Sequence, residues 1–468
     1  MNITLLKKWL HKYTGDIPQL YLIGGTVRDM FLNIPPKDID LSCRGARDFA
    51  YNLAAICNAA IVPMEKKPQT PCYRVVDRED INNYLDIAEI RGETIYDDLQ
   101  QRDFTINAIA IELNRDGSIA GTIDPLNGAQ DISNRIIKAV RQDAFASDPL
   151  RIIRAFRFSA TLNFDIEDLT LDHIRKNVEL LILVSGERIF SELLLILGTT
   201  NSTQFIKQMD QFGILAVLFP EIRAMKGCSQ NAFHHKDVWE HSLLVMENCE
   251  EDLNKLPALF EELSDEITGN LSRDHRFAVT KLAALLHDIG KPACREIVPD
   301  TGRITFHGHG EKGAGLMDDI AERLKMSGRD REFLKLLVSE HLHLRNLAKH
   351  GVKPATKMRW FRKMKDDVIP SIIVGMADVK SSLGPESSVQ DRDNFLQWSH
   401  ETIKDYYETI KNRLERRDLI TGRDLITLGM EPGPEMGRIL EHIRCAQDTG
   451  EVNNSDDALA MARELLSH

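Results

Sequence analysis

Apolar and polar residues follow two different patterns along the chain. Over roughly the first 145 residues, short apolar runs alternate with amphipathic stretches, as in a sheet flanked by helices. The expected strands are residues 21–25, 38–42, 59–64, 73–77, 83–90 and 106–113. Residues 1–20 fit one amphipathic helix that ends near residues 15–18. From about residue 146 the apolar positions recur with a helical period. The pattern predicts an α/β domain with a mixed sheet, followed by a mainly helical region.

The length of the chain, 468 residues, exceeds what one hydrophobic core supports. We therefore expect several domains. They are an α/β head over residues 1–145, a helical neck over 146–225, a helical body over 226–400 and a helical tail over 401–468.

The amino-acid composition restricts the class of protein and the compartment in which we expect it. Apolar residues make up 43% and charged residues 28%, and no apolar run reaches the ~20 residues of a membrane span, so no membrane partner is expected. The seven cysteines form no CxxC pair, which fits reduced thiols in a cytoplasmic protein. The net charge of −12 does not favour a nucleic-acid binder, although a local basic face would suffice. No protein partner can be inferred.

The stretch over residues 21–42 carries the densest candidate chemistry. Asp38 and Asp40 would share one face of a strand, where their mutual repulsion favours a bound cation. Mg²⁺ carried by substrate phosphates is the natural one. Gly24 and Gly25 would form a turn whose N–H groups hold phosphate, with Arg28 just beyond. Together these residues indicate nucleotidyl transfer. The alternative is a strand with an exposed acidic edge.

Two later segments offer further groups for such a site. Asp86, inside an expected strand, could complete metal coordination or accept a proton from the attacking hydroxyl. Its alternative is an ordinary acid on an edge strand. Arg102 and Asp103 precede the expected strand at residues 106–113, so the arginine could reach a triphosphate. Alone, an Arg–Asp pair also fits a surface salt bridge.

Residues 146–158 predict a helix with Asp148 as its N-cap and Pro149 in its first turn. Arg151 and Arg154, three residues apart, would lie on one face of it. Two arginines close to an acid can bind the edge of a nucleotide base through paired hydrogen bonds. The alternative is a solvated basic stripe.

A second chemical centre is indicated by histidines and acids spread over the body. Asp288 follows an apolar run and would be costly to bury without a partner such as a metal ion. The ordered set resembles the HD phosphohydrolase superfamily, which implies one divalent metal held on a helical bundle. The residues concerned are His241, His287, Asp288 and Asp378, with His309 and His341 able to add a second site. The implied ion is Mn²⁺, Ni²⁺ or Mg²⁺.

Residues 353–365 contain six basic side chains and no acid, with Trp360 and Phe361 among them. Contact with an RNA phosphate backbone is one interpretation, and a solvated helix face around a buried tryptophan is the other. The candidate RNA-binding residues are Lys357, Arg359, Arg362 and Lys363.

Taken together and in order, these motifs resemble one family. GGTVRD, KDIDL, QRDFTINAIA, DPLNGAQDI, DPLRIIRAFRF and SGERIFSEL closely resemble the class II tRNA nucleotidyltransferase (CCA-adding enzyme) and bacterial poly(A) polymerase family. The resemblance spans nearly the whole chain, with an HD domain that many bacterial members carry.

This resemblance implies a polymerase-beta-like head that uses Mg²⁺ to transfer C or A from CTP or ATP to an RNA 3′ end. It implies that Asp38, Asp40 and Asp86 are the catalytic carboxylates. The residues implied to bind the nucleotide are Gly24, Gly25, Arg28, Arg102, Asp103, Asp148, Arg151 and Arg154. For the HD centre it suggests phosphatase or 2′,3′-cyclic phosphodiesterase activity on RNA ends.

One position departs from the family pattern, because Ser147 stands where members usually have Glu. This puts the switch between C and A addition in question, so an A-adding enzyme or a poly(A) polymerase is an alternative. Two other classes remain open: an HD phosphohydrolase with a nucleotide-sensing head, and a non-catalytic RNA-binding protein.

Overall fold

The computed structural model describes residues 2–36, 38–64 and 71–466, so Lys37 of the motif at residues 21–42 lies outside the described residues. The chain divides into two compact units. The first runs to Glu192 and also takes in Met209–Leu218. The second takes in Leu193–Gln208 and the chain from Phe219 onward. The finer division into four domains stays a prediction.

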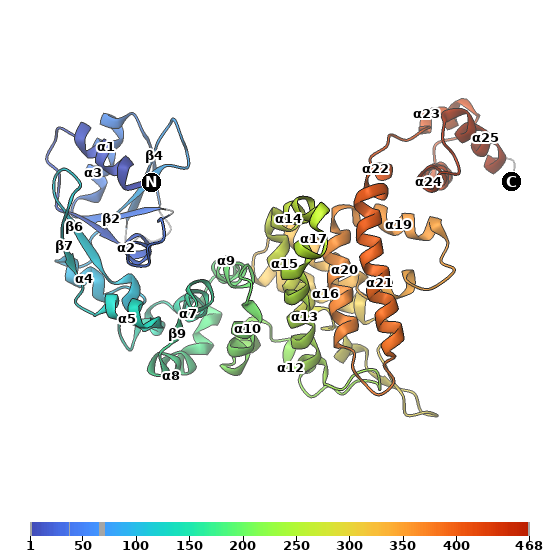
Figure 1. Ribbon diagram of the computed structural model, residues 1–468, viewed down its shortest axis with the longest axis horizontal. Helices are drawn as coiled ribbons and strands as arrows, with labels where there is room; N and C mark the ends of the chain where they lie inside the picture. Colours follow the sequence, from blue (N-terminus) through green and yellow to red (C-terminus); the bar gives the residue numbers. More distant parts are fainter. Residues whose placement is uncertain (1, 37, 65–70, 467–468) are drawn as a thin grey trace. The chain divides into compact units, whose positions relative to one another are not determined.

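A seven-stranded mixed sheet forms the core of the first unit (Figure 1). The strands are β1 (Leu20–Ile23), β2 (Ile39–Cys43), β3 (Ala60–Pro63), β4 (Cys72–Val76), β5 (Tyr84–Glu89), β6 (Ala110–Leu113) and β7 (Ile119–Ile123). Their order is β3-β4-β5-β2-β1-β6-β7, and β2 pairs with β5 in parallel. On β2 and β5 the residues flanking Asp40 and Asp86 are fully buried, so these two carboxylates point to the opposite face of the sheet.

The expected α/β head with a mixed sheet is confirmed, with three local differences. Strand β7 was not predicted, because its sequence IAGTI lacks a clear alternation. The first helix, α1 (Asn2–Lys12), ends earlier than expected, before the helix-disfavouring Thr14 and Gly15. Asp38 lies just before β2 and not within it, so only Asp40 occupies the strand.

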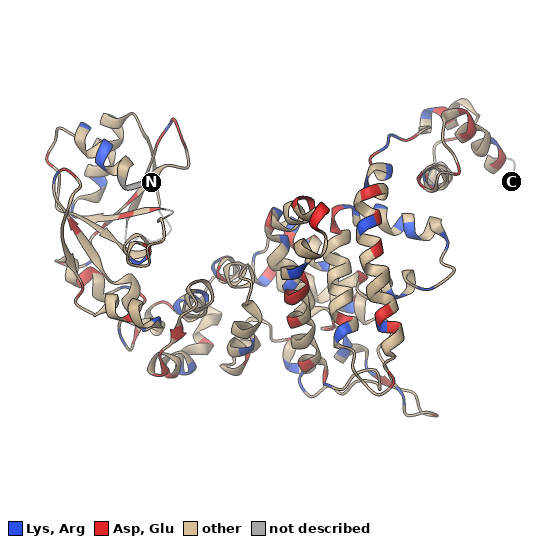
Figure 2. Cartoon of the chain, in the orientation of Figure 1, with Lys and Arg blue, Asp and Glu red and all other residues tan. Residues whose placement is uncertain are grey.

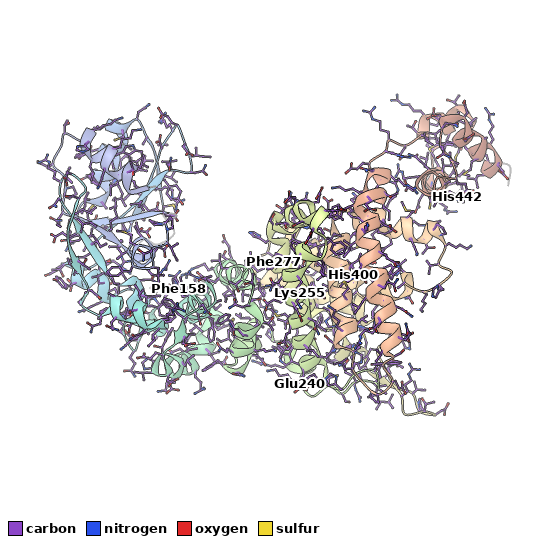
Figure 3. All side chains as sticks on the ribbon, viewed as in Figure 1. Phe158, Glu240, Lys255, Phe277, His400 and His442 are labelled. Atoms are coloured by element: carbon purple, nitrogen blue, oxygen red, sulfur yellow. The ribbon has the colours of Figure 1, made fainter. Side chains whose placement is uncertain are left out.

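The first unit contains helices beside the sheet, and the rest of the chain is mainly helical. In the first unit they are α2 (Gly24–Phe31), α3 (Ala46–Cys57), α4 (Ile95–Gln100), α5 (Gly128–Asn134), α6 (Ala144–Ser147), α7 (Leu150–Leu162), α8 (Asp168–Asn177) and α11 (Ile214–Leu218). Helices α9 (Gly186–Leu197) and α10 (Ser202–Gln211) cross the limits of the two units. Phe158 of α7, labelled in Figure 3, lies in this helix. It packs edge-on against Phe104, with ring centroids 5.7 Å apart, and so joins α7 to the head. The prediction that Asp148 caps α7 is wrong: Pro149 occupies the N-cap position, and Asp148 ends α6.

The second unit is a helical bundle, as the sequence pattern predicts. Its main helices are α12 (Ile222–Met225), α13 (Val238–Leu259), α14 (Ser264–Ser272), α15 (Arg276–Leu286), α16 (His309–Arg323), α17 (Gly328–Glu340), α18 (His343–Leu347), α19 (Pro354–Met364), α20 (Val368–Ser381) and α21 (Val389–Asp405). Helices α15 and α20 are buried along most of their length and pack against α13. A buried helix must place any polar side chain against a partner, and this constraint gathers the histidines and acids at one place.

The C-terminal segment has a small core of its own. It contains α22 (Lys411–Leu414), α23 (Gly422–Thr427), α24 (Pro434–Thr449) and α25 (Ser455–Leu466). Buried apolar residues of the last three helices form one cluster, and α24 packs against α19. Among the residues that the structure describes, no helix combines the length and apolar character needed to cross a membrane.

Candidate active site

The register of three neighbouring strands brings two predicted carboxylates together. β2 and β5 place Asp40 opposite Asp86, and β4 places Arg74 opposite Asp86 on its other side. Arg74 donates to both oxygens of Asp86, from Nε and Nη2, at 2.8 Å each. Two acids and a base therefore form one row across the sheet. Arg74 was not predicted, because an arginine in a half-buried strand carries no distinguishing signal.

Asp40 is oriented by the helix that follows the first strand. Thr26 of α2 accepts a hydrogen bond from the backbone N–H of Asp40 at 2.8 Å and donates to the carbonyl of Asp38 at 3.0 Å. Burial, reinforced by the nearby charge of Asp86, raises the pKa of Asp40 to about 6. A carboxylate that is difficult to ionise beside another carboxylate gains stability when a cation is bound, so the residues fit a divalent metal.

Asp38 is held by an aromatic residue that the sequence did not single out. The hydroxyl of Tyr84 donates to Asp38 Oδ1, and burial raises the pKa of Tyr84 to about 12, which keeps this donor protonated. The guanidinium of Arg74 lies 3.9 Å from the centroid of the Tyr84 ring. One stacked Arg–Tyr pair thus positions Asp38 and Asp86 together.

The two predicted glycines do not form a separate turn but begin α2. Gly24 has φ +62°, and a Cβ there would lie 3.1 Å from Arg102 Nη1 and 3.5 Å from Asp40 Oδ2. A Cβ on Gly25 would lie 3.7 Å from Asp40 Oδ2. The start of the helix therefore approaches both the arginine and the carboxylate, an arrangement that suits a phosphate group bridging them through a metal.

Both predicted phosphate-binding arginines are fixed by neighbouring groups. Arg28 donates to Asp29 Oδ1 at 2.6 and 2.9 Å and to Asn107 Oδ1 at 3.0 Å. Arg102 donates to Asp98 Oδ2 at 2.7 and 3.0 Å. Such pairing holds the guanidinium groups in place before a ligand arrives.

Asp103 does not face solvent, as a surface salt bridge would. Its Oδ2 accepts from Arg154 Nε at 3.0 Å, and its Oδ1 accepts from Asn107 Nδ2 at 3.0 Å. Burial opposes ionisation, but the charge of Arg154 outweighs it and lowers the pKa of Asp103. Arg154 also pairs with Glu192 at 3.4 Å. Asp103 therefore joins the head to α7.

The predicted base-selecting residues are brought to one region, where each contacts groups of neighbouring segments. Arg151 Nη2 donates to the carbonyl of Gln101 at 2.8 Å, and its Nη1 lies 3.4 Å from Ser147 Oγ. Asp148 pairs with Arg188 at 3.0 Å, a residue that the sequence reasoning missed. Arg151 thus contacts a neutral hydroxyl at the position where relatives are expected to have a carboxylate.

The predicted HD residues meet inside the bundle. His241 comes from α13, His287 and Asp288 from the end of α15, His309 from the start of α16, His341 from the end of α17 and Asp378 from α20. His241 Nε2 lies 3.2 Å from Asp378 Oδ1, and His287 Nε2 lies 3.1 Å from Asp288 Oδ2. His309 Nε2 lies 3.3 Å from Asp288 Oδ1. All six side chains are buried.

Three of these histidines share one hydrogen-bonding pattern. Nδ1 of His287, His309 and His341 each faces the carbonyl of the residue three positions earlier, at 2.9, 2.7 and 2.7 Å. Nδ1 must carry the proton in such a contact, so in the neutral imidazole each Nε2 presents a lone pair. Nε2 of His309 and of His341 lie 3.3 Å apart. Converging lone pairs of this kind fit a divalent cation.

The potential metal ligands fall into overlapping groups. His241, His287 and Asp288 form one, and Asp288, His309 and His341 form another, with ligand atoms within 4.8 Å in each. A third group adds His234 to His241 and Asp378. His234 was missed, since it lies in a loop beside a second histidine. Asp288, shared between two groups, could bridge two ions.

Neighbouring positive charges keep the carboxylates of this centre ionised. Lys291 Nζ lies 2.6 Å from Asp288 Oδ2, and Arg345 Nη2 lies 3.0 Å from Asp378 Oδ2. Burial opposes ionisation at both acids. His287 and then Lys291 outweigh it at Asp288, and Arg345 outweighs it at Asp378, so the pKa of both acids is held well below the usual value. Ionised carboxylates are the form that binds metal.

The predicted RNA-binding helix, α19, is basic on part of its surface (Figure 2). Arg362 is committed to Asp448, with Nη2 2.7 Å from Oδ1, and Lys363 lies 2.5 Å from Glu340. Trp360 is buried. The role of the four candidate residues in RNA binding stays a prediction.

Family models match four parts of the chain, and the last two overlap. They are the "Poly A polymerase head domain" over residues 20–138, the "Probable RNA and SrmB-binding site of polymerase A" over 163–226, the "HD domain" over 238–382 and "tRNA nucleotidyltransferase domain 2" over 372–462.

Relatives match this chain along almost its whole length. The A-adding tRNA nucleotidyltransferase of Deinococcus radiodurans is 30% identical over 460 residues, covering 95% of each chain. The CC-adding tRNA nucleotidyltransferase of Thermus thermophilus is 28% identical over 446 residues, covering 94% of this chain and 92% of the relative.

Solved structures share the fold. A CCA-adding enzyme in complex with CTP matches with a TM-score of 0.65 at 24% identity, over all of this chain and 95% of the other. The Thermotoga maritima CCA-adding enzyme bound to tRNA matches with a TM-score of 0.62 at 23% identity, over 99% and 94% of the two chains. From the carboxylate row, the fold and these full-length matches, the chain belongs to the tRNA nucleotidyltransferase family.

Proposed function

We propose that this protein adds C, A or both from CTP and ATP to the 3′ end of tRNA in the cytoplasm. The observation that carries the proposal is the register of β2 and β5, which sets Asp40 against Asp86 with Asp38 alongside. The likeness to A-adding and CC-adding relatives supports tRNA as the substrate. All seven cysteines are free, which suits a reducing compartment.

Each residue of the head has a task in this proposal. Asp38, Asp40 and Asp86 would hold Mg²⁺, which when bound supplies Lewis-acid activation of the RNA 3′-hydroxyl and neutralises pyrophosphate. Arg28 and Arg102 bind the triphosphate. These arginines are already oriented by their hydrogen bonds, so they need little rearrangement to do so.

Base selection would come from the surface where α7 meets the head. Arg151 and Asp148 present hydrogen-bonding groups at this surface, and Arg154 keeps α7 attached through Asp103. Because residue 147 is a serine, Arg151 lacks a carboxylate from that position. Incorporation of CTP and ATP on tRNAs ending before C74, at C75 and at A76 (standard tRNA numbering of bases) determines which nucleotides are added.

The first test is the double substitution Asp38→Ala with Asp40→Ala. We expect loss of nucleotide addition by at least about 1000-fold, because both metal-holding carboxylates are gone, with an unchanged circular dichroism spectrum. Glu93→Ala, an exposed carboxylate in the same unit, serves as the matched control and should retain activity. Addition at the wild-type rate by the folded double variant would refute the assignment.

For the HD centre we propose a second activity, metal-dependent hydrolysis of phosphate esters at RNA ends. It rests on Nε2 of His287, His309 and His341, which converge on the buried carboxylate of Asp288. The ion would be Mn²⁺, Ni²⁺ or Mg²⁺. Metal analysis and hydrolysis assays on the wild type and His287→Ala test it. Absence of metal and of hydrolysis in both proteins would leave this centre a structural cluster only.

A further inference from the structure

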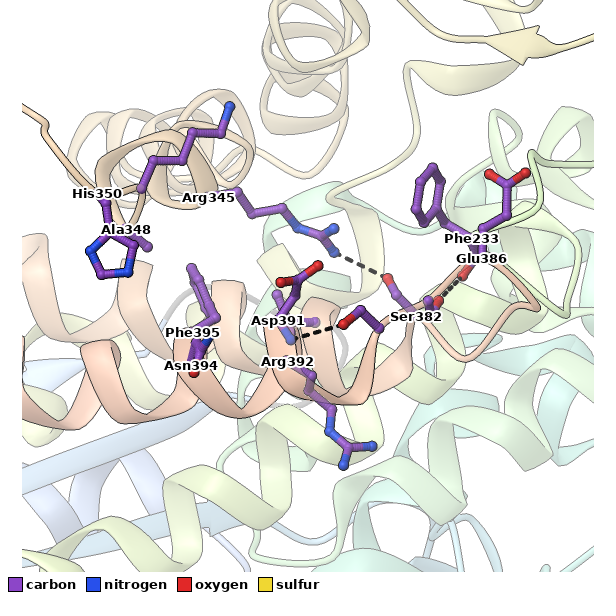
Figure 4. Close-up of a pocket in the computed structure, with 14 residues that line it drawn as sticks. Phe233, Arg345, Ala348, His350, Ser382, Glu386, Asp391, Arg392, Asn394 and Phe395 are labelled. Carbon is purple, nitrogen blue, oxygen red and sulfur yellow. Dashed lines mark hydrogen bonds between the residues drawn. The ribbon is translucent and has the colours of Figure 1, made fainter.

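A pocket beside the HD centre has no role in the activities discussed so far. It lies between α18, α21 and the loops around residues 233 and 382–388 (Figure 4). Phe233 and Arg345 line this pocket and also line the pocket that contains Asp288, His309 and His341. The two pockets therefore adjoin through an aromatic ring and a guanidinium group. We call the first one the side pocket.

Phe233 and Arg345 are both next to potential metal ligands, one in sequence and one through a hydrogen bond. Phe233 is followed directly by His234, a member of one metal group. Arg345 Nη2 donates to Asp378 Oδ2 at 3.0 Å and to Ser382 Oγ at 3.1 Å. Among the described residues, Arg345 Nε is buried without a hydrogen-bond partner. A ligand that accepts from Arg345 in the side pocket would thus be in place for chemistry at the HD centre.

The wall that carries Phe233 is rigid. Its carbonyl accepts from the N–H of Gly384 and from Ser387 Oγ, each at 2.9 Å. A Cβ on Gly384 would lie 2.2 Å from the carbonyl oxygen of Ala232, so this close approach of two loops requires glycine. The pocket is therefore pre-formed, as binding sites for small molecules usually are.

The lining indicates the chemistry of the ligand. With Arg345, the cations Lys349 and Arg392 outnumber the acids Glu386 and Asp391 of the lining, and this excess of positive charge favours a phosphate. Arg392 also pairs with Asp393 at 3.1 Å. Phe233 offers an apolar face on which a base can stack. Asp391, whose backbone N–H donates to the hydroxyl of the N-cap residue Ser388, lies on the same wall and offers a carboxylate to sugar hydroxyls or to an amino group of the base. Cations, an aromatic ring and hydrogen-bonding groups in one pocket suit a nucleotide better than an isolated phosphate.

We propose that the side pocket binds the terminal nucleoside of an RNA 3′-phosphate, together with its 5′-linked phosphate, while the terminal phosphate lies at the HD centre. This inference rests on the proposed hydrolase activity of that centre. In the reaction, water attacks phosphorus and the bond from phosphorus to the ribose 3′-oxygen breaks. That oxygen takes up a proton, leaving a 3′-hydroxyl and inorganic phosphate. The side pocket selects RNA ends over simple phosphate esters.

The test compares two substrates, the dinucleotide ApA carrying a 3′-phosphate and p-nitrophenyl phosphate, on the full chain loaded with Mn²⁺. In the double variant Lys349→Ala with Arg392→Ala, we expect kcat/KM for the dinucleotide to fall at least about tenfold. For p-nitrophenyl phosphate it should change less than about twofold. The matched control is Lys404→Ala, which removes a lysine of α21 that is absent from the pocket lining and should behave as wild type. Equal kcat/KM values for the dinucleotide in variant and wild type would overturn the proposal.

A binding experiment separates this inference from the hydrolase proposal. If the wild type hydrolyses neither substrate, the hydrolase activity is refuted, and titration calorimetry with the same dinucleotide in EDTA decides the role of the pocket. The head is identical in both proteins, so a Kd weaker by about fivefold or more in the double variant reports the side pocket. Equal Kd values would refute nucleotide binding there.

Discussion

The raised pKa of Asp40 leads to a prediction in which loss of activity is accompanied by gain of stability. Asp40→Asn keeps the size of the side chain and the backbone hydrogen bond to Thr26 Oγ1, but removes the ionisable group. Nucleotide addition should be abolished, because an amide cannot replace the metal-binding carboxylate. In the absence of metal, the folded protein should nevertheless become more stable at neutral pH.

The magnitude follows from linkage between protonation and folding. The pKa rises from 3.8 to about 6, roughly two units, and each unit corresponds to about 1.4 kcal/mol, so ionised Asp40 costs the fold about 3 kcal/mol. A raised acid pKa means that the folded state holds the proton more tightly. The stability it contributes is complete below pH 3.8 and is lost as pH rises through 6. Asp40→Asn should therefore stabilise the metal-free protein at pH 8 and have little effect near pH 4.

Urea unfolding in EDTA at pH 4.5, 6 and 8 measures this difference. We expect the free energy of unfolding of Asp40→Asn to exceed that of the wild type by up to about 3 kcal/mol at pH 8. Added Mg²⁺ should close the gap, since it stabilises only the wild type. Glu93→Gln, an exposed acid of the same unit, is the control and should show no such trend. A destabilised variant at pH 8, or a difference that does not depend on pH, would refute the reasoning.

Further predictions concern groups whose partners are now known. Arg154→Ala leaves Asp103 buried without its cation, so it should lower the free energy of unfolding by about 3 kcal/mol, with partial recovery in Arg154→Lys. Urea unfolding measures this loss, and a value below about 1 kcal/mol would contradict the reasoning. Lys281→Met should destabilise the second unit by a similar amount, because Lys281 is fully buried and pairs with Glu250 at 2.8 Å, and thermal unfolding measures it. Gly24→Ala, at φ +62° and against a guanidinium, should lower kcat/KM for ATP and CTP at least about tenfold in addition assays.

The sequence predicted the metal-ligand candidates of the HD centre more completely than the residues that contact them. Histidine and aspartate at the ends of apolar helices stand out, because burial of such groups needs a partner. His234 did not stand out, since a loop histidine beside another histidine has no such context. Lys291 and Arg345 were missed for a related reason: a cation is identified as a partner only when the acid that it faces is known.

In the head, the sequence predicted the strands and the carboxylates, but it predicted only part of how they are arranged. Asp38 was placed in the strand, whereas the strand begins one residue later. The glycines were placed in a turn, whereas they begin α2. Both differences involve element boundaries, where local propensity is nearly balanced and tertiary packing decides.

By itself, the sequence determined which elements form, which residues can carry phosphate and metal chemistry, and the family to which the chain belongs. These features are local, because the spacing of apolar residues and the order of motifs can be recognised within single segments of the sequence. The tertiary structure decided which distant residues meet. The parallel register of β2 and β5 set Asp86 against Asp40, and β4 added Arg74 to the row. No local pattern encodes a register between strands far apart in the chain, because that register depends on how both strands bury their apolar faces in one core.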